Sequence, residues 1–316
     1  MGELTIKVIL GIVLLLTILF AIFVKRSKYE RNNFGMEEFY ISTDKLSNEE
    51  SIKAVFISDL HNNQFGENNK DLISAINDIN PDVILSGGDL IVCKGYSGCG
   101  TVVDTSEVVS LIEQLAAKYP VYMADGNHEI RMKENVSIYG KQYKQYTQRL
   151  KKSGAIYLND MTMVLNKDME KRYKNVDISR ENRGIAISAV DLDLSFYKKF
   201  MKKEIFADTI QSKIGRNNPK LYNIMFIHSP EYLKEAKEYG ADLVLSGHYH
   251  GGTVRLPLIG GLLSPQIKLF PKYSGGIYKY DNSALIVSRG LGTHSINIRF
   301  NNISQLAVIH IAGIKE

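Results

Sequence analysis

The chain has 316 residues, of which 44% are hydrophobic and 23% charged, and its formal net charge is +5. This composition is ordinary for a folded globular protein with one large domain or two small ones. The net charge is too small to indicate nucleic-acid binding, and part of it lies in one basic cluster at residues 25–31. Two cysteines exclude a disulfide framework and a four-cysteine zinc site.

The N-terminal segment predicts a membrane-spanning helix. Residues 4–24, with an unbroken apolar run from residue 8, can cross about 30 Å of hydrocarbon if Lys7 extends its ammonium to the interface. A cleaved signal peptide is the alternative, but the run ends in Phe23-Val24-Lys25-Arg26, which is a poor cleavage site. We therefore expect an uncleaved anchor at residues 4–24 and a juxtamembrane lead-in at residues 25–50, with a strand-like stretch at residues 38–42.

The basic cluster that follows the span bears on membrane orientation. Lys and Arg are enriched in the cytoplasmic segments that flank membrane spans. The cluster therefore favours a single-pass protein of the cell membrane with its domain on the cytoplasmic side. Digestion of the domain by a protease added to intact cells would contradict this orientation.

From residue 51 onward, strand-like runs alternate with helical patterns. Two successive strand-helix-strand units argue for an α/β fold with a parallel sheet at its core. The predicted strands are residues 54–57, 83–85, 121–124, 184–190, 221–227, 243–245, 276–280, 284–288 and 306–311. The predicted helices are residues 71–79, 108–117, 142–152, 195–213 and 231–239, and residues 166–183 are predicted as a loop or hairpin insertion.

Five polar motifs with metal-ligand side chains each follow one of the strand-like runs. They are Asp59-Leu60-His61, Gly87-Gly88-Asp89, Gly126-Asn127-His128-Glu129, His228 and Gly247-His248-Tyr249-His250. Side chains at i and i+2 of an extended segment point to the same side, and the carboxyl ends of strands face the crevice where α/β sheets bind ligands. Each motif alone is common by chance, but the ordered set predicts one metal site, and residues 51–316 then form one domain. His294 and His310 lack this context.

The ordered motifs resemble those of the calcineurin-like metallophosphoesterase family, from about residue 52 to residue 252. The N-terminal anchor and the Gly-His-x-His-Gly-Gly ending are most similar to the family's bacterial membrane-anchored branch. The resemblance implies an α/β fold, a four-layer α/β/β/α sandwich of two mixed sheets. It also implies that Asp59, His61, Asp89 and His250 hold one ion, and that Asp89, Asn127, His228 and His248 hold a second. His128 would protonate the leaving alkoxide, and Glu129 would orient the His128 imidazole.

The donor types agree with that implied chemistry. Mixed oxygen and nitrogen donors suit two divalent ions such as Mn²⁺, Fe²⁺ or Zn²⁺, which clamp the attacking and leaving oxygens and lower the pKa of water to about 7. We therefore expect a hydrolase that cleaves phosphodiester or pyrophosphate bonds with metal-activated hydroxide. A hydrolase of lipid-linked nucleotide pyrophosphates such as UDP-2,3-diacylglucosamine is one alternative, and a non-catalytic metal-binding scaffold is another. A nuclease is disfavoured because no basic stripe is present.

Departures from the family pattern narrow the expected substrate. Family members that dephosphorylate proteins carry an arginine in a Gly-Asp-x-x-Asp-Arg-Gly stretch, whereas Leu90-Ile91-Val92-Cys93 follows Asp89 here. A protein phosphatase is therefore disfavoured. Tyr249 stands where Thr or Ser is common between the last two histidines, and an i+1 side chain should point away from the metals.

The sequence allows two interpretations for each of two loops. Cys93 and Cys99 in a Gly-rich loop are either two thiols or a disulfide, which requires an oxidising compartment. The apolar residues 256–265 after the last ligand are either an ordinary loop over the core, or a wall that accepts acyl chains or dips into a bilayer.

Overall fold

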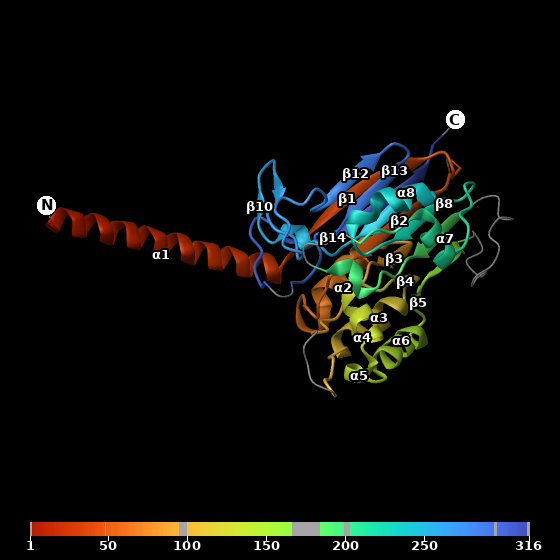
Figure 1. Cartoon of the computed structure of the whole chain (residues 1–316), viewed down its shortest axis with the longest axis horizontal. Coiled ribbons are helices and arrows are strands. Elements are labelled where there is room, and N and C mark those ends of the chain that lie inside the picture. The colour runs from red at the N-terminus through yellow and green to blue at the C-terminus, as the bar shows by residue number, and fades with distance from the viewer. Residues whose placement is uncertain are drawn as a thin grey trace.

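Two mixed β-sheets packed face to face form the centre of the domain (Figure 1). The structure is a computed structural model that describes residues 2–47, 49–94, 100–165, 184–198, 203–293 and 296–314. The first sheet has the order β1 (Phe34–Thr43), β14 (Ser304–Gly313), β2 (Ser51–Ile57), β3 (Val83–Ser86), β4 (Val121–Met123) and β5 (Ile156–Tyr157). The second has the order β12 (Gly276–Tyr280), β13 (Ser283–Val287), β9 (Leu243–Ser246), β8 (Tyr222–Phe226), β7 (Ile185–Ala189) and β6 (Met161–Leu165).

Alternate side chains of the central strands fill the space between the sheets. Phe56 of β2 and Phe226 of β8 meet there, with ring centroids 6.4 Å apart. Val55 and Ile57, the neighbours of Phe56, are also fully buried but belong to the core on the other face of the first sheet. Because both faces are covered, the strand sequences are apolar throughout rather than alternating.

Helices cover the outer faces and complete four layers. Leu72 and Ile76 of α2 pack with α3 and α6 on the first sheet, and Ile210 of α7 packs with α8 on the second. This arrangement confirms the α/β/β/α sandwich of two mixed sheets that the resemblance implies. The helices are α2 (Lys70–Ile79), α3 (Ser106–Ala116), α4 (Asn127–Glu134), α5 (Val136–Tyr139), α6 (Gln142–Lys152), α7 (Ala207–Ile214) and α8 (Leu233–Tyr239).

The helix predicted at residues 195–213 is wrong as a single element. A short 3₁₀ helix, η3 (Leu194–Tyr197), ends where Lys198 turns extended, with φ −65° and ψ 140°. Extended Phe206, with φ −119° and ψ 156°, then precedes α7. The sequence also missed β5, β6, α4 and α5, and the insertion predicted at residues 166–183 lies outside the described residues.

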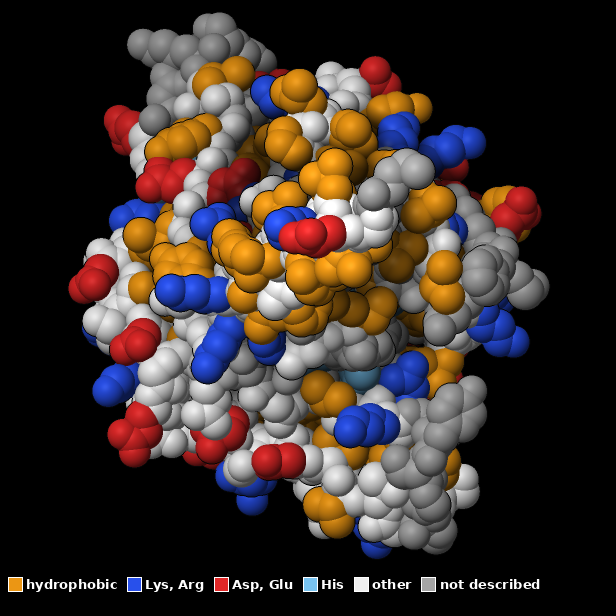
Figure 2. Space-filling model, turned by 90° about the vertical axis from the view of Figure 1, so that its left-hand side faces the viewer, with side chains coloured by type: hydrophobic (Ala, Val, Ile, Leu, Met, Phe, Trp, Pro, Cys, Tyr) orange, Lys and Arg blue, Asp and Glu red, His pale blue; other side chains and the backbone are white. Residues whose placement is uncertain are grey.

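The N-terminal helix α1 (Gly2–Asn32) projects from one face of the domain, which Figure 2 views with α1 pointing toward the reader. It is long and apolar enough to cross a membrane, with a mean hydropathy of 2.9 over an 18-residue window. The helix continues past residue 24, and Ser27 and Glu30 in its last turns are buried against the domain. The strand-like stretch of the lead-in belongs to β1, which pairs with β14 in parallel at the edge of the first sheet.

Candidate metal centre

All five motifs lie just beyond the C-terminal ends of strands, where the two sheets' loops converge. Asp59 and His61 follow β2, Asp89 follows β3, and Asn127 opens α4 after β4. From the second sheet, His228 follows β8, and His248 and His250 follow β9. Since β2, β3 and β4 run parallel, as do β8 and β9, the fold brings these loops to one edge of the sandwich.

The donors form two groups, and a third group of His61, Asp89 and His128 overlaps both of them. In the first, Nε2 of His250 lies 3.6 Å from Oδ1 of Asp59 and 3.2 Å from Nε2 of His61. In the second, Asp89 joins His228 and His248, and Oδ2 of Asp89 lies 3.2 Å from Nε2 of His228. Asp89 Oδ2 is also 3.9 Å from Nε2 of His61, so this carboxylate stands between the groups. Within each group one donor atom per residue lies within 4.8 Å of the others, which is a spacing that one cation can bridge.

Backbone carbonyl groups hold three of the imidazoles in place. Nδ1 of His228 lies 2.8 Å from the Gly87 carbonyl oxygen. The corresponding distances are 3.2 Å from His250 to Gly292 and 3.3 Å from His61 to Ile91. A carbonyl oxygen only accepts, so each Nδ1 carries a hydrogen, and Nε2 is the nitrogen that can offer a lone pair to a cation when the ring is neutral. This is the arrangement that neutral imidazole ligands require.

The buried charges of the centre call for a cation. Burial raises the pKa of Asp59 to about 6, against the opposing effect of His228. Burial alone would lower the pKa of His228, but the carboxylates of Asp89 and Asp59 outweigh it and raise that pKa to about 9. In the metal-free protein, a protonated His228 therefore offsets the buried carboxylates. Divalent cations would provide the same compensation more completely.

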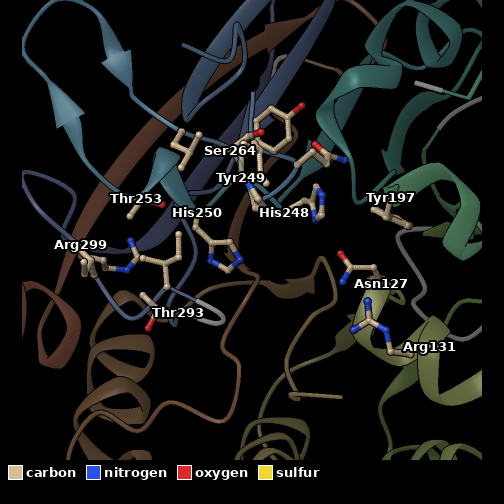
Figure 3. Close-up of a pocket in the computed structure, with 16 residues that line it drawn as sticks. Asn127, Arg131, Tyr197, His248, Tyr249, His250, Thr253, Ser264, Thr293 and Arg299 are labelled. Carbon is tan, nitrogen blue, oxygen red and sulfur yellow. The ribbon is translucent and has the colours of Figure 1, made fainter. Parts of the chain in front are cut away.

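The amide oxygen of Asn127 supports a metal fit independently. Oδ1 of Asn127 is buried and accepts no hydrogen bond from the part of the chain that the structure describes. An unsatisfied buried acceptor costs about 1–3 kcal/mol. Asn127 faces His248 and His250 across the pocket in Figure 3, so a cation among these side chains would satisfy the oxygen.

The backbone at the ligand positions is strained. Asp59, Asp89 and His248 have φ of 52°, 52° and 68°, in the left-handed region that non-glycine residues rarely adopt. Each such residue costs on the order of 1–3 kcal/mol, and such residues cluster at functional sites. Close packing adds a further constraint, because a Cβ on Gly126 would lie 2.3 Å from Oδ1 of Asp89. Any larger residue at Gly126 would displace that carboxylate.

His128 lies beside the donors with a defined tautomer. The backbone N–H of Cys93 donates to Nδ1 of His128 over 2.7 Å, so the neutral ring carries its hydrogen on Nε2. The expectation that Glu129 orients this imidazole is wrong. The Glu129 carboxylate accepts the backbone N–H groups of Asp89, Leu90 and Gly126 instead, at 2.8, 2.9 and 3.1 Å. Glu129 therefore fixes the loop that presents Asp89.

Sequence reasoning missed two pocket residues. Arg131 lies one helical turn after Asn127 on α4, and its guanidinium donates to the Cys93 carbonyl at 2.7 Å. Tyr197 packs edge-on against His248, with ring centroids 5.0 Å apart. The Gly126-x-x-Glu129 spacing is a helix-start pattern that would have placed Arg131 near Asn127. A guanidinium at this position is suited to bind a phosphate oxygen.

The remaining candidates lie away from the centre or outside the described residues. His310 is on β14, stacked on Tyr40 with ring centroids 4.6 Å apart. His294 and Cys99 are outside the described residues, and Cys93 is buried. Tyr249 points its hydroxyl to Glu231, as an i+1 side chain should.

Comparison with known proteins identifies the family. The model of the calcineurin-like phosphoesterase family matches residues 52–252, more than half of the chain. A metallophosphoesterase of Bacillus subtilis, YkuE, is 25% identical over 79% of this chain and 76% of its own length. The UDP-2,3-diacylglucosamine pyrophosphatase LpxG of Chlamydia trachomatis is 25% identical over 78% of this chain and 80% of its own length. The chain belongs to the calcineurin-like phosphoesterase family and is a hydrolase of phosphoric ester bonds.

Proposed function

We propose that the chain is a membrane-anchored enzyme that hydrolyses phosphodiester or pyrophosphate bonds at a centre of two divalent metal ions. The position of Asp89 between the two groups of donors carries this proposal. A carboxylate in that position is suited to bridge two cations. Residues 4–24 would form the anchor and residues 51–316 the catalytic domain, whose first sheet also includes β1.

Seven side chains would hold the ions. The first ion takes Asp59, His61, Asp89 and His250, and the second takes Asp89, Asn127, His228 and His248. Their mixed oxygen and nitrogen donors suit Mn²⁺, Fe²⁺ or Zn²⁺. Such ions supply positive charge to phosphoryl oxygens and lower the pKa of water to about 7.

His128 would donate a proton to the leaving oxygen. Its ring is buried beside the donors, with Nδ1 engaged by the Cys93 N–H and the hydrogen of the neutral ring on Nε2. In the group with Asp89 and His61, this side chain is near the centre without belonging to the seven ligands that the resemblance implies. Its place fits a proton donor better than a structural histidine.

Metal dependence is the first expected result. The purified chain, stripped with a chelator, should not hydrolyse bis-p-nitrophenyl phosphate, and addition of Mn²⁺, Fe²⁺ or Zn²⁺ should restore the release of p-nitrophenolate. The reason is that the side chains of the centre lack the positive charge and the acidic water that the ions supply. Absence of turnover with every divalent metal tried would contradict the proposal and favour the metal-binding scaffold.

A lipid-linked substrate is the second candidate, supported by the lining of the pocket. Leu263, Pro265 and Ile267 line the same pocket as His248 and His250, together with Ile296 and Ile298. An apolar wall beside a phosphate-hydrolysing centre fits a substrate whose headgroup continues into acyl chains. The names of the LpxG relatives point to the same class of substrate.

The two substrate classes can be separated by kinetics. A nucleoside diphosphate linked to an acylated sugar should have a kcat/KM at least about tenfold above that of its deacylated analogue, since burying two methylene groups stabilises binding by about 1.6 kcal/mol. Leu263→Ser should reduce this preference and leave hydrolysis of the deacylated analogue unchanged. Equal kcat/KM values for the two substrates would favour a small water-soluble substrate.

A further inference from the structure

The loop of residues 254–270 exposes a cluster of large apolar side chains. It contains the short antiparallel strands β10 (Arg255–Leu256) and β11 (Gly260–Gly261). Leu258 is fully exposed, and Leu269, Ile259 and Phe270 are 68%, 62% and 52% exposed. Leaving several such side chains in water in one loop is unfavourable, and contiguous exposed apolar surface marks an interaction site.

Phe300 joins this 254–270 loop to α1. The ring of Phe300 stacks on that of Phe23 in α1, with centroids 5.0 Å apart. The backbone of Phe300 accepts a hydrogen bond from Arg255 N–H at 2.9 Å and donates one to the Thr253 carbonyl at 3.2 Å. The start of the loop is therefore one residue away from the apolar part of α1. Figure 1 shows β10 on the side of the domain from which α1 projects.

The end of α1 is fixed to the domain, so the loop keeps a constant place relative to the helix. The backbone N–H of Arg299 donates to the Ser27 hydroxyl at 3.2 Å, and that of Asn302 donates to the buried Glu30 carboxylate at 2.8 Å. Eight helical residues separate residue 24 from the end of α1, a rise of about 12 Å. With residues 4–24 in hydrocarbon, the domain surface around Phe300 would lie at the level of the lipid headgroups.

We propose that the 254–270 loop is a second membrane contact. It inserts its apolar side chains into the membrane leaflet next to the domain, from which α1 emerges. The inference rests on the proposed insertion of α1 in a bilayer. The charges nearby fit a lipid surface, because Lys25 and Lys28 of α1 and Lys272, just after the loop, are exposed. In Figure 2 hydrophobic side chains gather around α1, and Lys and Arg side chains border them.

The same loop connects the membrane to the centre. Leu263, Pro265 and Ile267 line the pocket that holds His248 and His250, while Leu258 and Ile259 lie at the exposed end. Insertion would therefore place one wall of the pocket next to the bilayer. The phosphoester of a lipid-linked substrate could then reach the centre while its acyl chains stay in the membrane.

The chain contains no tryptophan, so a single introduced tryptophan is a unique fluorescent reporter. We would reconstitute the full chain in vesicles of phosphatidylcholine and phosphatidylglycerol, with and without bromine on the acyl chains, and measure emission and quenching. Leu258→Trp tests the loop, and its exposure means that no core packing is lost. Phe20→Trp reports on α1. Phe206→Trp, exposed just before α7 on the side away from α1, is the matched control in water.

The expected result is a blue-shifted emission and strong quenching by brominated lipid for Leu258→Trp and Phe20→Trp, with neither for Phe206→Trp. Quenching of Phe20→Trp alone would overturn the second contact and leave the anchor intact. Absence of quenching at both positions would overturn the anchor and the contact together. A blue shift of Leu258→Trp without quenching would show that protein rather than lipid covers the loop, which also overturns the proposal. None of these readouts depends on phosphoesterase activity.

Discussion

Asp89→Asn is expected to lower kcat for bis-p-nitrophenyl phosphate by about a thousandfold or more, the largest loss of any single substitution we propose. Asp89 stands between the two groups, with its Oδ2 3.2 Å from Nε2 of His228 and 3.9 Å from Nε2 of His61. The amide removes the negative charge that would hold two cations side by side. The amide keeps an oxygen for the His128 backbone N–H, which now bonds Oδ1 of Asp89 at 2.7 Å. The variant therefore separates loss of charge from loss of local structure.

Metal binding and stability provide the controls for this variant. Burial alone would raise the pKa of Asp89, but His228, His128 and His61 hold it well below its usual range. Without metal, Asp89→Asn should therefore unfold at a lower temperature than the parent chain, because the amide loses this attraction. Added Mn²⁺ or Zn²⁺ should stabilise the parent chain but not the variant. Asp208→Asn, at an exposed position in α7, should retain full turnover. Near-normal activity of Asp89→Asn would contradict the bridging role proposed for Asp89.

His128→Gln is expected to show a loss that depends on the leaving group. General acid catalysis contributes about 10²–10⁴-fold, and this contribution is needed when a poorly stabilised alkoxide departs. Hydrolysis of an alkyl phosphodiester should therefore fall by about 10²-fold or more. A p-nitrophenyl ester should lose far less, because p-nitrophenolate leaves without a proton. The slopes of kcat/KM against leaving-group pKa in the parent chain and the variant measure the difference.

An equal loss on both substrates would contradict the proton-donor role of His128. It would instead indicate that His128 acts as a ligand or a structural residue, since the ring also lies near Asp89 and His61. His310→Gln is the matched control, because His310 stacks on Tyr40 at the edge of the first sheet. That variant should change neither rate. Metal content measured on both variants distinguishes loss of an ion from loss of a proton donor.

The sequence predicted the central strands well because a strand that is buried on both faces has a continuously apolar sequence. Residues 54–57 are continuously apolar, as a strand covered on both faces must be. The helix predicted at residues 195–213 failed for the opposite reason. Apolar spacing does not report where the backbone leaves the helical region, and Lys198 and Phe206 are both extended. Which strands pair is also not local, since β14 joins β1 and β2 from the far end of the chain.

The donors of the candidate centre were predictable because the sequence places them directly after strand-like runs. The carboxyl ends of parallel strands meet at one edge of a sheet, so strand ends far apart in the chain come together. The orientation of each side chain required the tertiary structure. Glu129 turned out to hold the loop of Asp89, and Arg131 entered the pocket through a helix that the apolar pattern did not predict.

By itself, then, the sequence predicted the parallel-sheet α/β core, the apolar N-terminal helix and metal-ligand motifs after the strands, because each depends on residue type and local spacing. The four layers and the division of the ligands between two ions followed only from the resemblance to the family. Only the tertiary structure decided that the end of α1 is fixed to the domain and that residues 254–270 lie exposed beside it. The apolar residues of a segment do not by themselves determine which other parts of the protein, or which lipids, pack against them. Here the contact from Phe23 to Phe300 places the loop at the foot of α1.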